Sequence, residues 1–240
     1  QISQTGLHSL DSRKDFWRIC APAIADPEFD AALSVYVNNR QGISGLTRTP
    51  VGLDGNTIVD YSNGKGAWNH QRLDDWRMQM FTGGLLINDP TGENVRQIPE
   101  IGDVMGIFSA SDQTNDPWFA KAGPHRGRVP NALDVVYDLR TSSRQVEADA
   151  VSIARVNAVV NHESFGIVLW DNMTMSRKNS LFKFANVADL LLSFERTLPP
   201  RVEADAFDPN DTTLWKAIYR RVTTLMNAVQ RNRGIWKYKY

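Results

Sequence analysis

Residues 212–240 carry a one-sided charge, with seven basic side chains and no acidic one in a chain whose formal net charge is zero. On a helix of 3.6 residues per turn, one side of this segment is apolar. That side carries Trp215, Ile218, Val222, Leu225, Met226 and Val229. Lys216, Arg220 and Arg231 gather on the other side with Thr223 and Asn227, within an arc of roughly 80°. The segment therefore predicts a helix with one face for a core and one for an acidic or phosphate-bearing surface.

Length and composition place the chain among ordinary globular proteins. It has 240 residues, 42% of them hydrophobic and 22% charged, which suits one large domain or two small ones. A net charge of zero argues against a general nucleic-acid binder. The sequence contains no run of 18 apolar residues, so it predicts no membrane-spanning helix. The single cysteine, Cys20, cannot form an internal disulfide, which suits folding in a reducing cytosol.

Local patterns predict a mixture of strands and helices. Strands are expected at 15–22, 57–61, 133–139 and 166–170, and helices at 27–38, from 99 onward, from 142 to 156, and at 186–198. Residues 40–56, which contain four glycines, predict a connecting loop. Asp208 and Pro209 predict the start of the basic helix. Strands and helices alternate in the second half, so we expect an α+β fold, with helices packed on a mixed β-sheet in two lobes.

The residue patterns of common active sites are missing from the sequence. The four histidines are scattered and a single cysteine cannot build a zinc site. The glycines of 64–66 and 123–127 lack the spacing of a phosphate-binding loop. Glu147 and Asp149 would diverge by about 200° on a helix, and nothing else converges on Asp134 and Asp138. We therefore predict no catalytic residue, no cofactor and no metal site. Seven tryptophans leave a glycan-binding or glycan-cleaving domain as the alternative, although Trp170 and Trp215 stand in apolar contexts that favour core packing.

Five motifs, in one order along residues 100–240, resemble the contractile phage tail sheath proteins. The first is the loop Asp116-Pro-Trp-Phe-Ala-Lys-Ala-Gly-Pro-His-Arg-Gly-Arg128, which follows the run Gly106-Ile-Phe-Ser-Ala-Ser-Asp112. The other four are Val156-Asn-Ala-Val-Val160, Gly166-Ile-Val-Leu-Trp170, Phe184-Ala-Asn-Val-Ala-Asp-Leu-Leu-Leu192 and Phe207-Asp-Pro-Asn-Asp-Thr-Thr-Leu-Trp215. Each motif alone is weak, but their shared order is specific. Residues 1–99 resemble the family only loosely.

Three departures from the family pattern indicate a divergent member, of the kind expected from a giant phage. Residues 171–174 replace a Gly-Ala-Arg-Thr sequence, Ala158 replaces a proline, and Ala188-Asp189 replaces a pair of arginines. The missing initiator methionine and the strand-like run Ile235–Tyr240, with no turn after it, lead us to expect a middle-to-C-terminal piece of a longer protein. The domain boundary is expected near residue 99, between an N-terminal lobe (1–99) and a C-terminal sheath domain (100–240).

The resemblance implies a structural subunit of a virion tail, made in the bacterial host cytoplasm. Sheath subunits stack as hexameric rings around an inner tube, and contraction drives that tube through the host envelope. The expected partners are other sheath subunits, the inner tube protein and the baseplate, with no membrane insertion and no direct nucleic-acid contact. The last long helix of the family approaches the tube, so the resemblance makes Lys216, Arg220 and Arg231 the expected tube-facing residues.

Related readings remain open at this stage. A type VI secretion system or a contractile bacteriocin uses a sheath with the same physics. If the basic C-terminus binds nucleic acid, that binding should depend steeply on salt concentration.

Terminal strands of family members pair with neighbouring subunits, a form of strand addition. If Ile235–Tyr240 leads into such an arm, the isolated chain should be monomeric.

Overall fold

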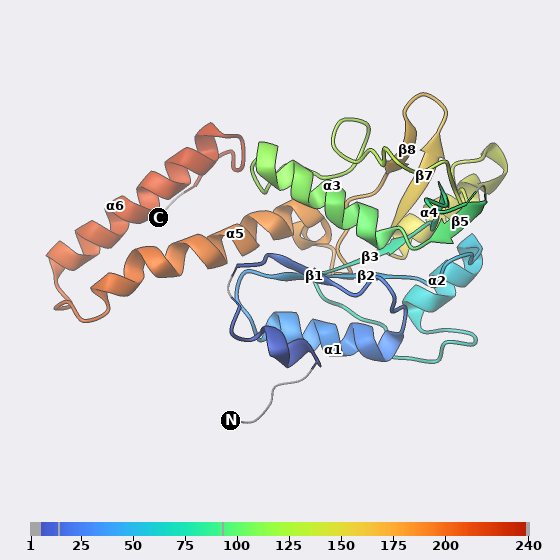
Figure 1. Cartoon of the computed structure of the whole chain (residues 1–240). Coiled ribbons are helices and arrows are strands. Elements are labelled where there is room, and N and C mark those ends of the chain that lie inside the picture. The colour runs from blue at the N-terminus through green and yellow to red at the C-terminus, as the bar shows by residue number, and fades with distance from the viewer. Residues whose placement is uncertain (1–5, 14, 93, 239–240) are drawn as a thin grey trace.

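The computed structural model describes residues 6–13, 15–92 and 94–238, and a five-stranded sheet forms its centre (Figure 1). The strand order is β1-β2-β3-β7-β8. The strands are β1 (Arg18–Cys20), β2 (Ser44–Arg48), β3 (Met78–Thr82), β7 (Val156–His162) and β8 (Gly166–Leu169). The first four are parallel to one another, and β8 is antiparallel to β7. Every residue of β2 and β3 is buried, because helices cover both faces of a parallel sheet.

Helices lie on both sides of this sheet (Figure 1). One hydrophobic cluster joins α1 (Pro27–Asn38), α2 (Gly55–Asn63) and α4 (Gln145–Ile153) to one face through Leu33, Ile58, Val151, Met80 and Val156, among others. A second cluster joins α3 (Ile101–Thr114) to the opposite face through Val104, Phe108, Phe81 and Val159. Val156 and Val159 lie on different faces because side chains alternate along a strand. The result is a three-layer arrangement with the sheet in the middle.

A small antiparallel sheet extends from the end of β3. Its order is β5-β4-β6, with β4 at Leu85–Asn88, β5 at Val95–Ile98 and β6 at Asp134–Val135. The chain turns from β3 into β4 at Gly83 and Gly84, whose φ angles are 138° and 60°. Only glycine adopts such angles readily. The expected boundary at residue 99 falls between β5 and α3, and both sheets draw strands from both sides of it.

Four short turns of 3-10 helix are distributed along the described chain, and its last two helices are long. These turns are η1 (Gly6–Leu10), η2 (Ser142–Arg144), η3 (Leu181–Lys183) and η4 (Glu203–Asp205). The long helices are α5 (Ala185–Val202) and α6 (Thr212–Arg231). The described residues include no helix with the length and apolar character needed to cross a membrane.

The predicted fold class is confirmed: the fold is α+β, with helices packed on a mixed sheet. The helix predicted at 27–38 has the predicted bounds, the helix predicted from residue 99 begins at Ile101, and the strand predicted at 166–170 is β8. Two of these three carry a strong local signal. Pro27 stands at the start of α1 after the capping residue Asp26, and β8 is a short apolar run.

Two N-terminal predictions are wrong. Residues 40–56 contain β2, an interior strand of the five-stranded sheet. Its sequence is not the continuous apolar run typical of such a strand, because it includes Ser44 and Gly45. A Cβ on Gly45 would meet Met78 Sδ at 2.4 Å, so close strand packing accounts for this glycine. Residues 57–61 form part of α2 and not a strand. Asp54 caps that helix and Gly64 ends it with a φ of 65°, so its ends outweigh the β-branched residues inside.

Three further element boundaries differ from prediction. The strand expected at 133–139 is reduced to Asp134–Val135. The helix expected to reach Val156 ends at Ile153, and Val156 begins β7. The helix expected to stop before Pro199 continues to Val202. It continues because the Glu203 amide donates to the Pro199 carbonyl and closes the next turn, so the prolines remove hydrogen bonds without ending the helix.

Candidate interaction surface on the C-terminal hairpin

Helices α5 and α6 form an antiparallel hairpin that projects from the body (Figure 1). Residues 203–211 connect them at the far end. Asp211 begins α6, since its Oδ1 accepts hydrogen bonds from the Thr213 amide at 2.8 Å and the Leu214 amide at 2.9 Å. The predicted cap at Asp208 is therefore wrong by one turn. A carboxylate cap also complements the positive end of the helix dipole.

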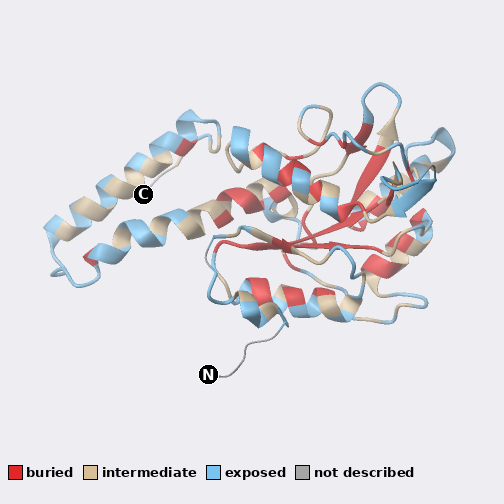
Figure 2. Cartoon of the chain, in the orientation of Figure 1, coloured by how far each residue is buried: buried red, intermediate tan, exposed pale blue. Residues whose placement is uncertain are grey.

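The predicted amphipathic helix is confirmed, but its apolar face is only partly covered. Val229 is the one buried residue of α6, at 3% exposure. Residues 218, 222, 225 and 226 are half-buried. The prediction that Trp215 packs in a core is wrong, because the residue is 58% exposed. Figure 2 shows the contrast between the buried centre of the body and the largely exposed hairpin.

The three predicted partner-binding residues lie together on the exposed surface of α6. Lys216, Arg220 and Arg231 are all exposed, and at 100° per residue they fall within an arc of about 60°. None of the three forms an ion pair with any described residue. The fold thus brings them onto one surface and leaves their charges uncompensated within the chain. Whether they meet an inner tube stays a prediction.

Other basic residues of the segment serve the hairpin itself. Arg221 forms an ion pair with Asp205 and donates to the Arg201 carbonyl at 3.0 Å, which ties α6 to the end of α5. The Arg233 guanidinium lies 5.9 Å from the centre of the Phe119 ring, a cation–π distance. Lys237 is exposed. Lys239 lies outside the described residues.

The segment after α6 turns back along that helix. The Gln230 side chain donates to the Trp236 carbonyl at 2.8 Å, and the Tyr238 hydroxyl donates to Asn227 Oδ1. Residues 235–238 form no strand, and residues 239 and 240 lie outside the described part of the chain. The run Ile235–Tyr240, expected as a strand, therefore forms no strand within this chain over its described residues, and its pairing with a neighbouring subunit stays a prediction.

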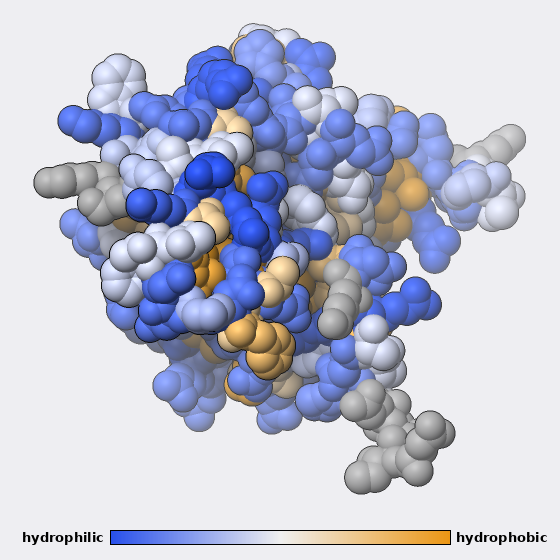
Figure 3. Space-filling view, turned by 90° about the vertical axis from the view of Figure 1, so that its left-hand side faces the viewer, coloured by the Kyte–Doolittle hydropathy of each residue, from blue (hydrophilic) through white to orange (hydrophobic). Residues whose placement is uncertain are grey.

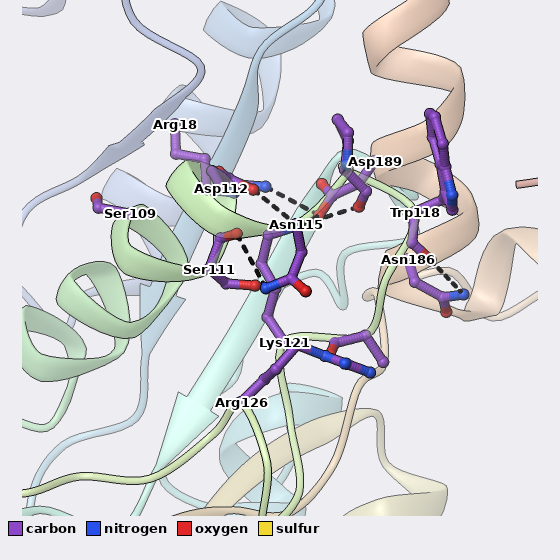
Figure 4. A network of polar contacts seen from close by, with 12 residues as sticks. Arg18, Ser109, Ser111, Asp112, Asn115, Trp118, Lys121, Arg126, Asn186 and Asp189 are labelled. Carbon is purple, nitrogen blue, oxygen red and sulfur yellow. Dashed lines mark hydrogen bonds and ion pairs between the residues drawn. The ribbon is translucent and has the colours of Figure 1, made fainter. Parts of the chain in front are cut away.

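Three buried charges and one half-buried charge fix the base of the hairpin to the body (Figure 4). Lys121 Nζ lies 2.7 Å from Asp189 Oδ2 and 3.2 Å from Asp112 Oδ1. Arg18 Nη2 lies 2.9 Å from the same Asp189 oxygen, and Arg18 Nη1 contacts Asp112. The four residues come from β1, α3, the loop after α3, and α5. Two cations and two carboxylates therefore join four elements into one neutral network.

This network is almost closed to solvent. The side chains of Lys121, Arg18 and Asp189 are 2%, 6% and 6% exposed, and only Asp112, at 20%, reaches solvent to a larger extent. Burial alone would lower the pKa of Arg18, but the charges of Asp189 and Asp112 outweigh burial and raise it. Arg18 and Lys121 also lie against the Phe108 ring, at 5.1 and 5.9 Å from its centre. Removal of one of these charges should destabilise the folded state, since a buried charge without its partner is strongly unfavourable.

The loop motif that carries the family resemblance has a structural role around this network. The Gly123 amide donates to the Leu169 carbonyl, and the Leu169 amide donates to the Gly127 carbonyl, both at 2.8 Å. Trp118 Nε1 donates to the Asn232 carbonyl at 2.9 Å, just after α6 ends. The loop thus connects the edge strand β8 with the end of the hairpin.

The sequence did not reveal this network, although parts of it carried a signal. Asp189 stood out as a departure from the family pattern, and Lys121 lies within the loop motif. Arg18 lies between Trp17 and Ile19 in a run that predicts a buried strand. A charged side chain in such a run indicates a buried ion pair, because it needs a partner there. What the sequence could not supply was the identity of that partner, 171 residues away.

The carboxylates considered for acid–base chemistry hold structure instead. Glu147 Oε2 accepts hydrogen bonds from the Tyr137 hydroxyl at 2.7 Å and the Gly55 amide at 3.2 Å. Asp134 and Asp138 both bind Asn161, through its side chain and its backbone amide respectively. Among the described residues, no group of three or more His, Cys, Asp or Glu side chains is placed to hold a metal ion.

Curated relatives give a consistent match by sequence. The chain is 24% identical over 233 residues to the tail sheath protein of Vibrio phage KVP40, which covers 97% of the chain and 33% of that protein. It is 22% identical over 144 residues to the tail sheath protein of Enterobacteria phage T4, which covers 60% of the chain and 21% of that protein. The chain therefore spans a third or less of the length of these relatives. No protein-family model matches it.

Solved structures match the fold. The sheath complex of the extracellular contractile injection system PVC, in its contracted state, aligns with a TM-score of 0.75 and 17% identity over 96% of the chain and 60% of that protein. A chain of the anti-feeding prophage baseplate aligns with a TM-score of 0.72 and 14% identity, over 96% of the chain and 57% of its own length. The resemblance predicted from the five motifs is thus confirmed: the chain is similar in sequence to phage tail sheath proteins and shares its fold with proteins of contractile injection systems.

Proposed function

We propose that the chain is the structural part of a sheath subunit that polymerises around an inner tube and contracts to drive that tube through a host envelope. The observation that carries this proposal is the sequence match to a phage tail sheath protein along 97% of the chain. The fold shared with sheath and baseplate proteins supports assembly with other sheath subunits and with a baseplate. The role is mechanical and requires no catalytic residue. No observation favours a glycan-binding or glycan-cleaving function.

The surface proposed to meet the tube is the basic face of α6, formed by Lys216, Arg220 and Arg231. The support is that these cations are exposed and have no ion-pair partner among the described residues. An exposed ion pair contributes only about 0–1 kcal/mol. Many stacked subunits add such contributions, while each contact stays weak enough to break when the sheath expands. A large apolar interface would resist that release.

Contraction is then an exchange between two packings of a subunit that itself changes little. The stored free energy lies in contacts between subunits that are poorer in the extended state than in the contracted state. The buried charge network suits this role, since it holds the hairpin in one position on the body. In isolation the chain is expected to be monomeric. Sedimentation of a stable hexamer would contradict that expectation.

Electron microscopy of the full-length gene product, expressed alone and with its tube protein, tests the proposed function. Hollow striated tubes are the expected result, and their helical parameters would follow from the images. Compact particles under several salt conditions would contradict self-assembly. Genes beside this one would separate a phage tail from a secretion system or a bacteriocin.

Charge reversal tests the tube-facing surface separately. The double variant Lys216→Glu with Arg220→Glu should reduce co-sedimentation with tubes at least tenfold at low salt, because attraction becomes repulsion. The matched control is Lys65→Glu with Lys178→Glu, which reverses two exposed lysines away from the hairpin. High salt should narrow the difference between the two variants by screening. Unchanged co-sedimentation of the first variant would refute the tube-facing assignment.

A further inference from the structure

The loop between α5 and α6 is held in place yet presents an apolar side chain to solvent. Phe207 is 98% exposed. Arg221 binds the Asp205 carboxylate and the Arg201 carbonyl on one side of the loop, and Trp215 Nε1 donates to Asn210 Oδ1 at 2.6 Å on the other. A single exposed apolar side chain is ordinary. An exposed apolar side chain on a loop that is already fixed, however, loses little conformational entropy when a partner covers it.

Phe207 is part of a patch that is both aromatic and acidic. Trp215 and Tyr219, four residues apart on α6, are 58% and 55% exposed. Residues 203–215 contain four acidic side chains and no basic one: Glu203, Asp205, Asp208 and Asp211. We call residues 203–215 the hairpin tip. Asp205 is paired with Arg221 and Asp211 caps α6, whereas Glu203 and Asp208 are exposed and form no ion pair with any described residue. The tip therefore combines exposed rings with two uncompensated negative charges, next to a helix surface that is positive. Figure 3 views the molecule from the side to which the hairpin projects, where hydrophobic side chains form separate patches among hydrophilic ones.

A groove of the opposite charge lies on the body between α3 and residues 125–131. Its volume is about 560 Å³. Small and apolar residues of α3 form its floor: Gly102, Gly106, Ile107 and Ala110. A Cβ on Gly102 or Gly106 would meet no atom within 4 Å, so this part of the floor is open. We call this cavity the α3 groove.

The rim of the α3 groove is basic. It contains His125, Arg126 and Arg128, and Asp103 is the one acidic lining residue. Arg126 and Arg128 each use Nε to bind a backbone carbonyl at 2.8 Å, which fixes the direction of the side chain. Neither guanidinium forms an ion pair within residues 6–13, 15–92 and 94–238. The rim thus offers two positioned cations that a carboxylate can bind.

The tip and the groove of one molecule cannot meet. Figure 1 shows the tip at the far end of the projecting hairpin, whereas α3 lies over the sheet. We propose that the hairpin tip of one copy docks in the α3 groove of a neighbouring copy, with Phe207 on the open floor and the Glu203 and Asp208 carboxylates against Arg126 and Arg128. This rests on the proposed function, in which copies pack side by side. It adds a sheath–sheath contact distinct from the basic face proposed for the tube.

The size of the contact fits a repeated, reversible interaction. One aromatic ring buries about 150–250 Å², far below the 1,200–2,000 Å² of a stable interface. Docking should therefore be weak between two free copies and significant only where a lattice of subunits holds many tips near many grooves. That agrees with the monomeric state expected of the isolated chain.

Photo-cross-linking tests the docking directly. Phe207 is replaced by p-benzoylphenylalanine in the full chain, which is irradiated at high concentration and low salt, and again within assembled tubes. Cross-linked peptides are mapped by mass spectrometry. We expect cross-links from position 207 to residues 102–110 or 125–131 of a second copy. The control places the same photo-reactive residue at Trp236, which is 93% exposed but lies between the basic residues Arg233 and Lys237; it should not reach the groove.

Charge exchange provides the second readout. Arg126→Glu with Arg128→Glu should lower the yield of the groove cross-link about tenfold, and Glu203→Lys with Asp208→Lys on the photo-reactive copy should restore most of it. Restoration of the cross-link yield would show that the variant with the reversed rim still folds.

The docking would be overturned by cross-links that map elsewhere on the second copy, that map to the tube protein, or that are unaffected by both charge reversals. If tubes still assemble and contract without the 207–groove cross-link, the docking is wrong and the proposed function stands. If the full-length product forms no tubes, the cross-link in concentrated solution still decides the docking.

Discussion

The base of the hairpin and its outer surface use the same types of cation in opposite ways. At the base, Arg18 and Lys121 are 6% and 2% exposed, and each binds two aspartates. On the surface of α6, Lys216, Arg220 and Arg231 are exposed and bind no carboxylate of the described residues. The first arrangement sets where the hairpin lies on the body. The second leaves charge available to another molecule.

The difference teaches that burial and pairing decide what a charged residue contributes. Replacing a whole buried ion network by apolar side chains often changes stability little, but removing one partner is costly. An exposed charge has water as its partner and contributes little to folding. Substitutions at the base should therefore act on the fold, and substitutions on the surface should act on binding alone.

The largest effect is expected at Asp189, which binds both buried cations. Asp189→Ala leaves one positive charge of the network without a partner at 6% exposure or less. The free energy of unfolding should fall by about 3–5 kcal/mol, measured by chemical denaturation followed by circular dichroism. The double variant Asp189→Ala with Lys121→Met should recover part of that loss, because Arg18 and Asp112 remain as a pair. A double variant no more stable than the single one would contradict the pairing argument.

Asp30 differs from the carboxylates of the network at the base of the hairpin, because it is buried but forms no ion pair in the described part of the chain. It is 3% exposed, and burial, aided by the charge of Asp26, raises its pKa from 3.8 to about 7. Between these two values the folded chain keeps a proton that the unfolded chain has released. The free energy of unfolding should therefore fall as pH rises from about 4 to about 7, by at most roughly 4 kcal/mol.

Denaturation of the wild type and of Asp30→Asn across this pH range measures the effect. The variant should lose most of the slope and be the more stable of the two at pH 8. Equal slopes in the two proteins would show that Asp30 is not the titrating group.

Gly127 tests the loop at the base of the hairpin, and Gly106 on the exposed side of α3 is its control. A Cβ on Gly127 would lie 2.8 Å from the Leu169 carbonyl oxygen and 2.9 Å from the Ala122 Cα. Gly127→Ala should therefore lower the free energy of unfolding by about 1–3 kcal/mol through overpacking. Gly106→Ala meets no atom within 4 Å and should raise it by up to about 1 kcal/mol, since alanine favours a helix. Thermal unfolding compares the two; a stabilised Gly127→Ala would contradict the close approach.

These contrasts also explain what could be predicted from the sequence. The elements with a local signal were predicted well: α1 through Pro27 and Glu28, and α6 through its apolar and basic sides. Both signals arise from neighbouring residues. α2 was missed although its ends, Asp54 and Gly64, carry a local signal, whereas β2 was missed because the evidence for it is not local. Gly45 is required by Met78 on another strand, and Ser44–Arg48 is a strand only because strands lie on both sides of it.

The candidate site divides in the same way. The basic face of α6 follows from helical spacing alone, so Lys216, Arg220 and Arg231 were placed on one surface correctly. Trp215 was misplaced because spacing shows which side a residue is on but not whether anything covers that side. The four-charge network and the α3 groove both depend on elements brought together by the fold. Spacing along the chain contains no information on such contacts.

The smallest effect on stability is expected for substitutions on the surface of α6. A small change in the free energy of unfolding is what would show that these charges do not serve the fold. Lys216→Ala and Arg220→Ala remove charges that no described carboxylate binds, and alanine keeps the helix. Each should change the free energy of unfolding by less than about 0.5 kcal/mol, and the two changes should add, because neither residue has an ion-pair partner among the described residues. The double variant is measured beside Asp189→Ala under one set of conditions. A loss above about 1 kcal/mol would mean that these cations already serve the fold, as those at the base do. The surface would then have no uncompensated charge to offer, and the assignment of this face to an inner tube would lose its physical basis.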